Sequence, residues 1–84
     1  MPTVQVRYFA SLREALGPGE RIELPSGSTV GELRALLQAR GGRHAEVLGP
    51  GRAVRSALAQ VLCGDDARLE DGAEVAFFPP VTGG

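Results

Sequence analysis

Three segments of the chain alternate between apolar and polar residues, a pattern typical of half-buried β-strands. These segments are Thr3–Phe9, Arg21–Leu24 and Glu74–Phe78. A turn-forming Pro-Ser-Gly cluster follows the second segment, and two consecutive prolines follow the third. Because proline cannot donate to a sheet ladder, the third segment must end there. The pattern therefore predicts three strands, one near each end of the chain and one between them.

The main helix is predicted at Thr29–Arg40. Thr29 and Glu32 have the T-x-x-E spacing of a capping box, in which each side chain bonds the backbone amide of the other residue. Two glycines follow the segment and are typical of a helix end. An apolar stripe runs along one face of the predicted helix at Val30, Leu33, Leu36 and Leu37.

Three further segments have weaker patterns. Ala10–Leu16 has helical spacing, and its Ser11 and Glu14 match a second capping box. Arg43–Arg52 has no sustained periodicity and is interpreted as a loop with room for one helical turn. Val54–Val61 is rich in small and apolar residues, so we predict one buried strand there.

The order of these elements is strand, short helix, strand, main helix, strand, strand. It predicts an α+β fold of the β-grasp (ubiquitin-like) type, a small mixed sheet with one main helix packed on one face. Right-handed crossover would place the first and last strands side by side at the centre. We expect residues 1–78 to form this domain and residues 79–84 to form an extended, flexible C-terminal tail.

Composition narrows the possible functions. The chain has 84 residues, 43% of them apolar, which fits one small domain. Its net charge of −1 disfavours binding to nucleic acid or to an anionic membrane, and it has no apolar run of signal or membrane-spanning length. A single cysteine, Cys63, favours a reducing compartment, so we expect a cytoplasmic protein. All nine basic residues are arginines, which excludes lysine chemistry and a Walker A loop.

The last six residues carry the most specific chemical signal. Pro79 and Pro80 favour an extended exit from the sheet, and Gly83 and Gly84 have no side chain, so the terminal carboxylate could enter a narrow channel. A carboxylate is a poor electrophile and would need activation by a partner enzyme, for example as an acyl-adenylate. Attack by sulfur would then give a thiocarboxylate, whereas an amine would give a peptide-like link. Two terminal glycines alone could also simply end a chain.

The run Asp71–Gly84 resembles the ending of the molybdopterin synthase small subunit family, the ubiquitin-like sulfur carriers of molybdenum-cofactor biosynthesis. The likeness extends to the opening Val4–Glu14 and to the helix start at residues 29–33. Two departures are visible. Thr82 stands where the family often has alanine or serine, and Ala59-Gln60 replaces a frequent asparagine-glutamine pair.

The resemblance implies that Gly84 is adenylated by an activating enzyme of the ubiquitin-activating type and converted to a thiocarboxylate. It would then be inserted into the large subunit of the synthase, where it would give sulfur to cyclic pyranopterin monophosphate. ATP would be used by the activating partner, and this chain would bind no cofactor. The segment that enters the partner would comprise Pro79, Pro80, Val81, Thr82 and Gly83.

Other sulfur pathways remain open, namely thiamine, thiolated tRNA or cysteine synthesis, and so does a role as a ubiquitin-like protein modifier. On the last strand, Val75 and Phe77 should face the core, which leaves Phe78 on the other face as a docking residue. His44 has no second ligand at metal-binding spacing, so no metal site is expected. Two aspartates close to Cys63 should raise the pKa of its thiol and disfavour a reactive role.

Overall fold

The computed structural model describes residues 1–49, 51 and 53–80. Predictions about the tail residues Val81, Thr82, Gly83 and Gly84 therefore lie outside the described residues. The elements follow one another along the chain as β1 (Thr3–Tyr8), α1 (Ala10–Leu16), β2 (Gly19–Glu23), α2 (Val30–Gln38), α3 (Gly42–Leu48), β3 (Arg55–Leu58), β4 (Val61–Cys63) and β5 (Glu74–Phe78).

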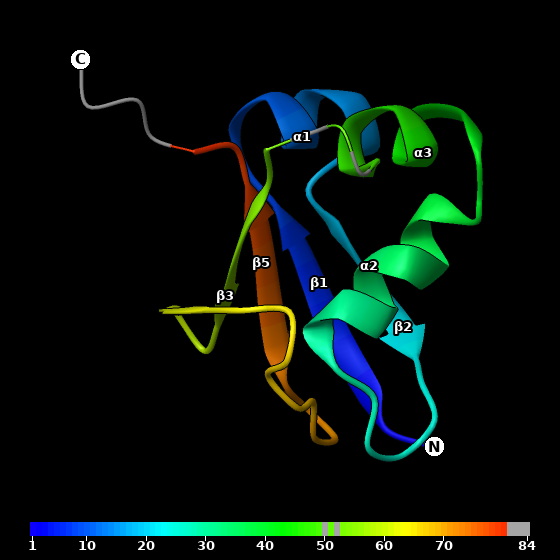
Figure 1. Ribbon diagram of the computed structural model, residues 1–84, viewed down its shortest axis with the longest axis vertical. Helices are drawn as coiled ribbons and strands as arrows, with labels where there is room; N and C mark the ends of the chain where they lie inside the picture. The colour runs from blue at the N-terminus through cyan, green and yellow to red at the C-terminus, as the bar shows by residue number, and fades with distance from the viewer. Residues whose placement is uncertain (50, 52, 81–84) are drawn as a thin grey trace.

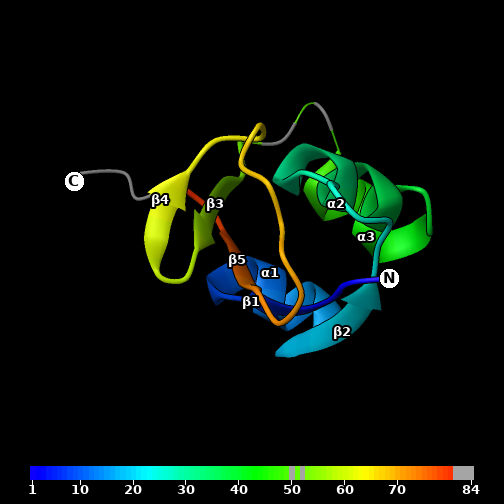
Figure 2. The same ribbon diagram turned by 90° about the horizontal axis from the view of Figure 1, so that it is seen from below.

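The strands form one mixed sheet in the order β2-β1-β5-β3-β4. The first and last strands, β1 and β5, lie parallel at its centre, and the other neighbours pair antiparallel. Helix α2 lies across one face, while α1 and α3 gather at the end of the sheet where β1 and β5 finish (Figures 1 and 2). This arrangement confirms the predicted α+β, β-grasp topology with β1 and β5 side by side.

The core lies between the sheet and the helices. Strand β1 alternates strictly, with Val4, Val6 and Tyr8 buried. Helix α2 contributes the predicted stripe, except that Leu36 is 38% exposed at its margin. Burial of these side chains is the main favourable term in the stability of the domain. The other fully buried large residues are Leu24, Val30, Leu33, Leu37, Leu48, Val75 and Phe77.

The two predicted capping boxes differ in outcome. At α2 the prediction is confirmed: Thr29 Oγ1 accepts from the Glu32 amide at 3.2 Å, and Glu32 Oε1 accepts from the Thr29 amide at 3.0 Å. At α1 the prediction is wrong, because the helix begins at Ala10, two residues earlier than a box with Ser11 as its N-cap requires. Its N-cap is Phe9, which makes no side-chain capping bond.

The predicted loop at Arg43–Arg52 is also wrong in its first half, which forms α3. This helix is held from outside, because α2 supplies donors for its C-terminal carbonyls. Arg34 donates from Nε to the Leu48 oxygen at 2.8 Å and from Nη2 to the Gly49 oxygen at 3.1 Å, and Gln38 also donates to Leu48. The stabilising contacts come from a distant segment, so the local pattern could not reveal them.

The single strand predicted at Val54–Val61 is a tight hairpin of β3 and β4. Its two turn residues, Ala59 and Gln60, have φ values of 50° and 69°. Left-handed backbone at both central positions is the geometry of a type I′ turn, which glycine and asparagine usually occupy. Because Ala-Gln lacks that signature, the sequence pattern concealed the turn.

This strain leads to a stability prediction. We expect Ala59→Asn to raise the free energy of unfolding by about 0.5–1 kcal/mol, since asparagine tolerates the left-handed region better than alanine does. Ala59→Val should lower it, because a β-branched residue is strongly disfavoured there. Urea denaturation of the three proteins measures both changes. Equal shifts of the same sign would show that the backbone at Ala59 is not strained.

Candidate functional site

Strand β5 places the predicted docking residue on the face of the sheet opposite to the one across which α2 lies (Figure 2). Its residues alternate in burial, with Val75 and Phe77 fully buried and Phe78 only half-buried on the opposite side. The predicted division of these three residues between the two faces is therefore confirmed. The role of Phe78 in docking remains a prediction.

Phe78 belongs to a larger apolar surface, which we call the outer patch. It consists of Phe9, Ala57, Leu62, Ala76 and Phe78, which line one shallow hollow together with polar residues at its margin. Leu62 is 67% exposed and Phe9 is 41% exposed. Large apolar side chains gathered in this way on a small domain indicate a site of protein contact. The sequence reasoning missed both Phe9 and Leu62. Phe9 ends the first predicted strand, and Leu62 lies just beyond the strand predicted at Val54–Val61, so the pattern did not bring them to Phe78.

Charged residues border the outer patch on one side. Arg7 Nη1 lies 3.8 Å from Glu74 Oε2, and both side chains are about half exposed. The guanidinium carbon of Arg7 also lies 5.9 Å from the centre of the Phe9 ring, within range of a cation–π contact. An apolar centre with a charged margin is the usual composition of a protein–protein interface.

The chain leaves the sheet beside this patch. Pro79 and Pro80 follow Phe78 directly and are half-buried, and Pro79 lines a small hollow with residues of α1 and α3. Strand β5 carries this exit to the end of the molecule that lies opposite the N-terminus (Figure 1). A partner that covers the outer patch would therefore also meet the start of the tail.

A polar cluster that the sequence did not predict lies on the helix side of the sheet, near the end where β1 finishes and β2 begins. Glu20 accepts from the Tyr8 hydroxyl at 2.7 Å, pairs with His44 Nε2 at 3.0 Å, and also pairs with Arg40. These residues come from β1, β2, α3 and the segment after α2, so the cluster joins all four parts. No local pattern signals it, because its members meet only in the folded chain.

The protonation of this cluster follows from its contacts. Burial disfavours ionisation of Glu20, but hydrogen bonds from Tyr8, His44 and Arg40, with the charge of Arg40, outweigh it and hold the pKa of the Glu20 carboxyl below its usual value. Burial, and next the hydrogen bond to Glu20, raises the pKa of the Tyr8 hydroxyl. The cluster therefore combines an ionised carboxylate with a neutral phenol.

Glu20→Gln should lower the free energy of unfolding by about 1–3 kcal/mol at neutral pH, since it removes the charge from three hydrogen bonds. The folded pKa of Glu20 lies below its unfolded value, so its contribution is complete above about pH 4.3 and is lost as the pH falls through the folded pKa. The difference between wild type and variant should therefore shrink in acid. Denaturation curves across pH measure it, with the exposed Glu14→Gln as control; a difference independent of pH would contradict this role.

The other two candidate residues from the sequence are Cys63 and His44. Cys63 is half-buried, and its pKa is raised first by burial and then by Asp65 and Asp66, which confirms the expected direction. His44 is engaged by Glu20. Within the described part of the chain, no three histidine, cysteine or acidic side chains lie close enough together to hold a metal ion. Nor does any helix in that part have the length and apolar character needed to cross a membrane.

Comparison with known proteins supports the family resemblance and the fold. The model of the ThiS family matches residues 6–84, which is nearly the whole chain. The chain belongs to the ThiS family. Among curated members of known name, it is 41% identical over 81 residues to the molybdopterin synthase sulfur carrier subunit of Escherichia coli K12. That match covers 96% of this chain and 99% of the relative.

Solved structures extend the comparison of this ThiS-family chain. A molybdopterin converting factor subunit 1 from Pyrococcus furiosus superposes with a TM-score of 0.79 at 34% identity, covering 96% of this chain and all of that one. Small archaeal modifier protein 1 of H. volcanii gives 0.78 at 25% identity, with 96% and 100% covered. A chain in the complex of subunits 1 and 2 of the molybdopterin-converting factor from Helicobacter pylori gives 0.69 at 29% identity, with 98% and 99% covered.

Proposed function

We propose that this chain is the sulfur carrier subunit of molybdopterin synthase, not an enzyme on its own. Its 41% identity over almost the full length of both chains to a relative of that name carries the proposal. The geometry supports it, because the outer patch offers a contact surface immediately beside the exit of the tail. The reacting group would be the carboxylate of Gly84.

Loading of the tail requires two steps in a partner enzyme. In the first, a Gly84 carboxylate oxygen attacks the α-phosphorus of ATP and pyrophosphate leaves, which gives an acyl-adenylate. In the second, sulfur at the oxidation level of sulfide attacks the acyl carbon and AMP leaves, which gives a thiocarboxylate. ATP would be a substrate of the adenylyltransferase. This chain has no lysine and therefore no Walker A loop, and we expect it to bind no cofactor. With one cysteine in the chain, we expect these steps in the cytoplasm.

Delivery takes place in the large subunit of the synthase. The tail segment Pro79–Gly83 would enter the partner, and the two terminal glycines would let the thiocarboxylate reach a site too narrow for a Cβ atom. The thiocarboxylate sulfur displaces an oxygen at a carbon of cyclic pyranopterin monophosphate, so that a carbon–sulfur bond forms as a carbon–oxygen bond breaks. Water then hydrolyses the acyl–sulfur bond, which returns the Gly84 carboxylate and leaves the sulfur on the product. A dithiolene contains two sulfur atoms, so two loaded tails are consumed for each product.

The chain would bind the activating enzyme and then the large subunit through the same surface, the outer patch. Leu62 and Phe78 supply its apolar centre, and the Arg7–Glu74 pair supplies a polar margin. Burial of one such apolar side chain contributes about 1.5–3 kcal/mol, or one to two decades of affinity. The same surface could not contact both partners at once, so loading and delivery would alternate.

A second candidate function is protein modification, which the likeness to small archaeal modifier protein 1 favours. In that case the activated Gly84 would form an amide with a lysine of a target protein. The chain has no lysine, so it could be attached once but could not be extended through lysine linkages. Delivery of sulfur to thiamine, tRNA or cysteine synthesis would use the same loaded tail. It would differ from the proposed function only in the molecule that accepts the sulfur.

Reconstitution tests the proposal. The loaded chain is mixed with the large subunit and cyclic pyranopterin monophosphate, and molybdopterin is measured. We expect about one molybdopterin for every two loaded chains, because each carries one sulfur. Absence of product, with covalent adducts of the chain on other proteins, would replace the proposal by the modifier function.

A further inference from the structure

The edge strand β2 has backbone groups free for pairing with another strand. Its amide-to-carbonyl ladder with β1 continues beyond both ends, where Leu24 donates to the Pro2 oxygen at 2.9 Å and Tyr8 donates to the Pro18 oxygen at 3.0 Å. Because antiparallel ladders alternate, Glu20 and Ile22 direct their backbone groups to β1. Arg21 and Glu23 direct theirs away from the sheet, and these groups make no backbone hydrogen bond to any other residue that the structure describes.

The two residues with outward backbone groups carry opposite charges. Both are exposed and stand on the face of β2 away from the helices, two positions apart. Among the described residues, neither side chain is engaged in a hydrogen bond or ion pair. Charged residues on an edge strand usually prevent pairing with other chains. When the approaching strand is an antiparallel copy of the same sequence, however, a positive and a negative residue two positions apart can attract the opposite charges of the second copy.

We propose that β2 is a self-association edge, at which two copies of this chain pair antiparallel about a two-fold axis through Ile22. In that register Arg21 lies opposite Glu23 of the second copy, and Glu23 lies opposite its Arg21. The two residues with free backbone groups therefore face each other, and the pairing closes four amide-to-carbonyl hydrogen bonds. On the outer face the four side chains alternate in sign, so each directly opposed pair is attractive. An interface of this kind is self-complementary, as two-fold symmetry requires.

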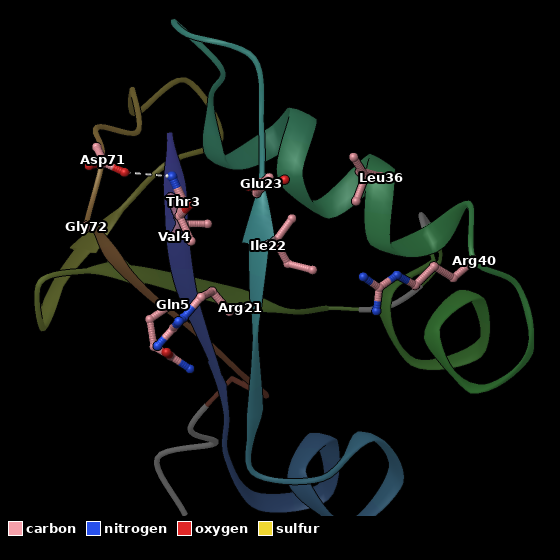
Figure 3. A pocket seen from close by; sticks show the side chains of 10 residues that line it. All are labelled: Thr3, Val4, Gln5, Arg21, Ile22, Glu23, Leu36, Arg40, Asp71 and Gly72. Atoms are coloured by element: carbon pink, nitrogen blue, oxygen red, sulfur yellow. Dashed lines mark hydrogen bonds between the residues drawn. The ribbon is translucent and has the colours of Figure 1, made fainter. Parts of the chain in front are cut away.

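The helix side of the same edge has a partly exposed apolar residue. Leu36 of α2 is 38% exposed and lines a hollow with Ile22 and Arg40 above the strand (Figure 3). A two-fold axis perpendicular to the sheet keeps α2 of both copies on the same side. It brings the two hollows together, so each Leu36 would lose solvent contact over the shared seam. Apolar burial would thus add to the hydrogen bonds and charges.

The proposed seam leaves the rest of the surface accessible. Strand β2 lies at the edge of the sheet opposite to β4, whereas the outer patch lies over β1, β5, β3 and β4 (Figure 2). Two paired copies would therefore present two outer patches and two tail exits at once. This inference goes beyond the proposed function and does not depend on it, since it concerns the unloaded chain alone.

Charge-reversal substitutions at Arg21 and Glu23, the two charged residues of the proposed interface, provide the test. Sedimentation equilibrium of the whole chain is measured from about 10 μM to about 1 mM, because so small an interface should be weak. We expect reversible association from 8.8 kDa to twice that mass. Arg21→Glu places four carboxylates at the seam, and Glu23→Arg places four guanidinium groups there, so each should lower the association constant at least about tenfold. The double variant restores the alternation and should return to within about threefold of wild type.

Arg13→Glu is the matched control, since Arg13 is exposed on α1 and its reversal changes the net charge as much as Arg21→Glu does. It should associate like wild type. As a second readout, hydrogen exchange at the amides of Arg21 and Glu23 should slow as concentration rises, while exchange elsewhere on the surface stays constant. A chain that remains monomeric throughout this range, or a double variant as weak as the single ones, would overturn the proposal.

Discussion

Deletion of Gly84 should abolish sulfur loading and leave the fold unchanged. The terminal carboxylate would then belong to Gly83, one residue short of the position at which the partner activates it. A shift of about 3.3 Å exceeds the tolerance of a positioned reaction, in which misplacement by about 1 Å can cost a hundredfold in rate. The measurement is thiocarboxylate formation after incubation with the activating enzyme, ATP and a sulfur source.

Deletion of Met1 provides the matched control, because it also removes one residue but from the opposite end of the molecule. It should load as wild type does. The thermal unfolding midpoint of the chain without Gly84 should equal that of wild type, since the described helices, strands and core residues all lie between Thr3 and Phe78. A truncated chain that still accepts sulfur would show that the reacting carboxylate is elsewhere.

Leu62→Asp should weaken binding to the large subunit more than about a hundredfold. The change removes an apolar contact worth about 1.5–3 kcal/mol and would bury an unpaired carboxylate, which adds a further penalty. Leu62 is 67% exposed, so the free chain should keep its stability. Titration calorimetry with the large subunit measures the change in affinity.

Val61→Asp is the control for this variant. Val61 precedes Leu62 in β4 and is also 67% exposed, but it pairs with Leu58 and points to the other face of the sheet. It should bind the large subunit as wild type does, with a comparable unfolding midpoint. If both variants bind equally weakly, the strand as a whole rather than the outer patch contacts the partner; if both bind normally, the outer patch is not the docking surface.

The sequence predicted the parts of the fold whose signals are local. Strand β1 has strict alternation, and α2 has both a stripe and a capping box formed by Thr29 and Glu32. Helix α3 was missed because its end is held by Arg34 and Gln38 from another helix. The hairpin was missed because Ala59 and Gln60 adopt left-handed backbone that their types do not favour.

The candidate site was predicted in part for the same reason. Alternation along β5 placed Phe78 on the outer face, since one strand contains that information. The rest of the outer patch could not be predicted, because Phe9 and Leu62 are far apart in the sequence and meet only through the sheet order. The Glu20 cluster is likewise assembled from separate elements.

The central claim is that the Gly84 carboxylate exchanges one oxygen for sulfur. Intact-mass spectrometry of the chain, after incubation with the activating enzyme, ATP and a sulfur source, tests it most directly. The account predicts a gain of about 16 Da, confined to a C-terminal fragment and absent without ATP. An unchanged mass under conditions in which the enzyme loads a known carrier would contradict it.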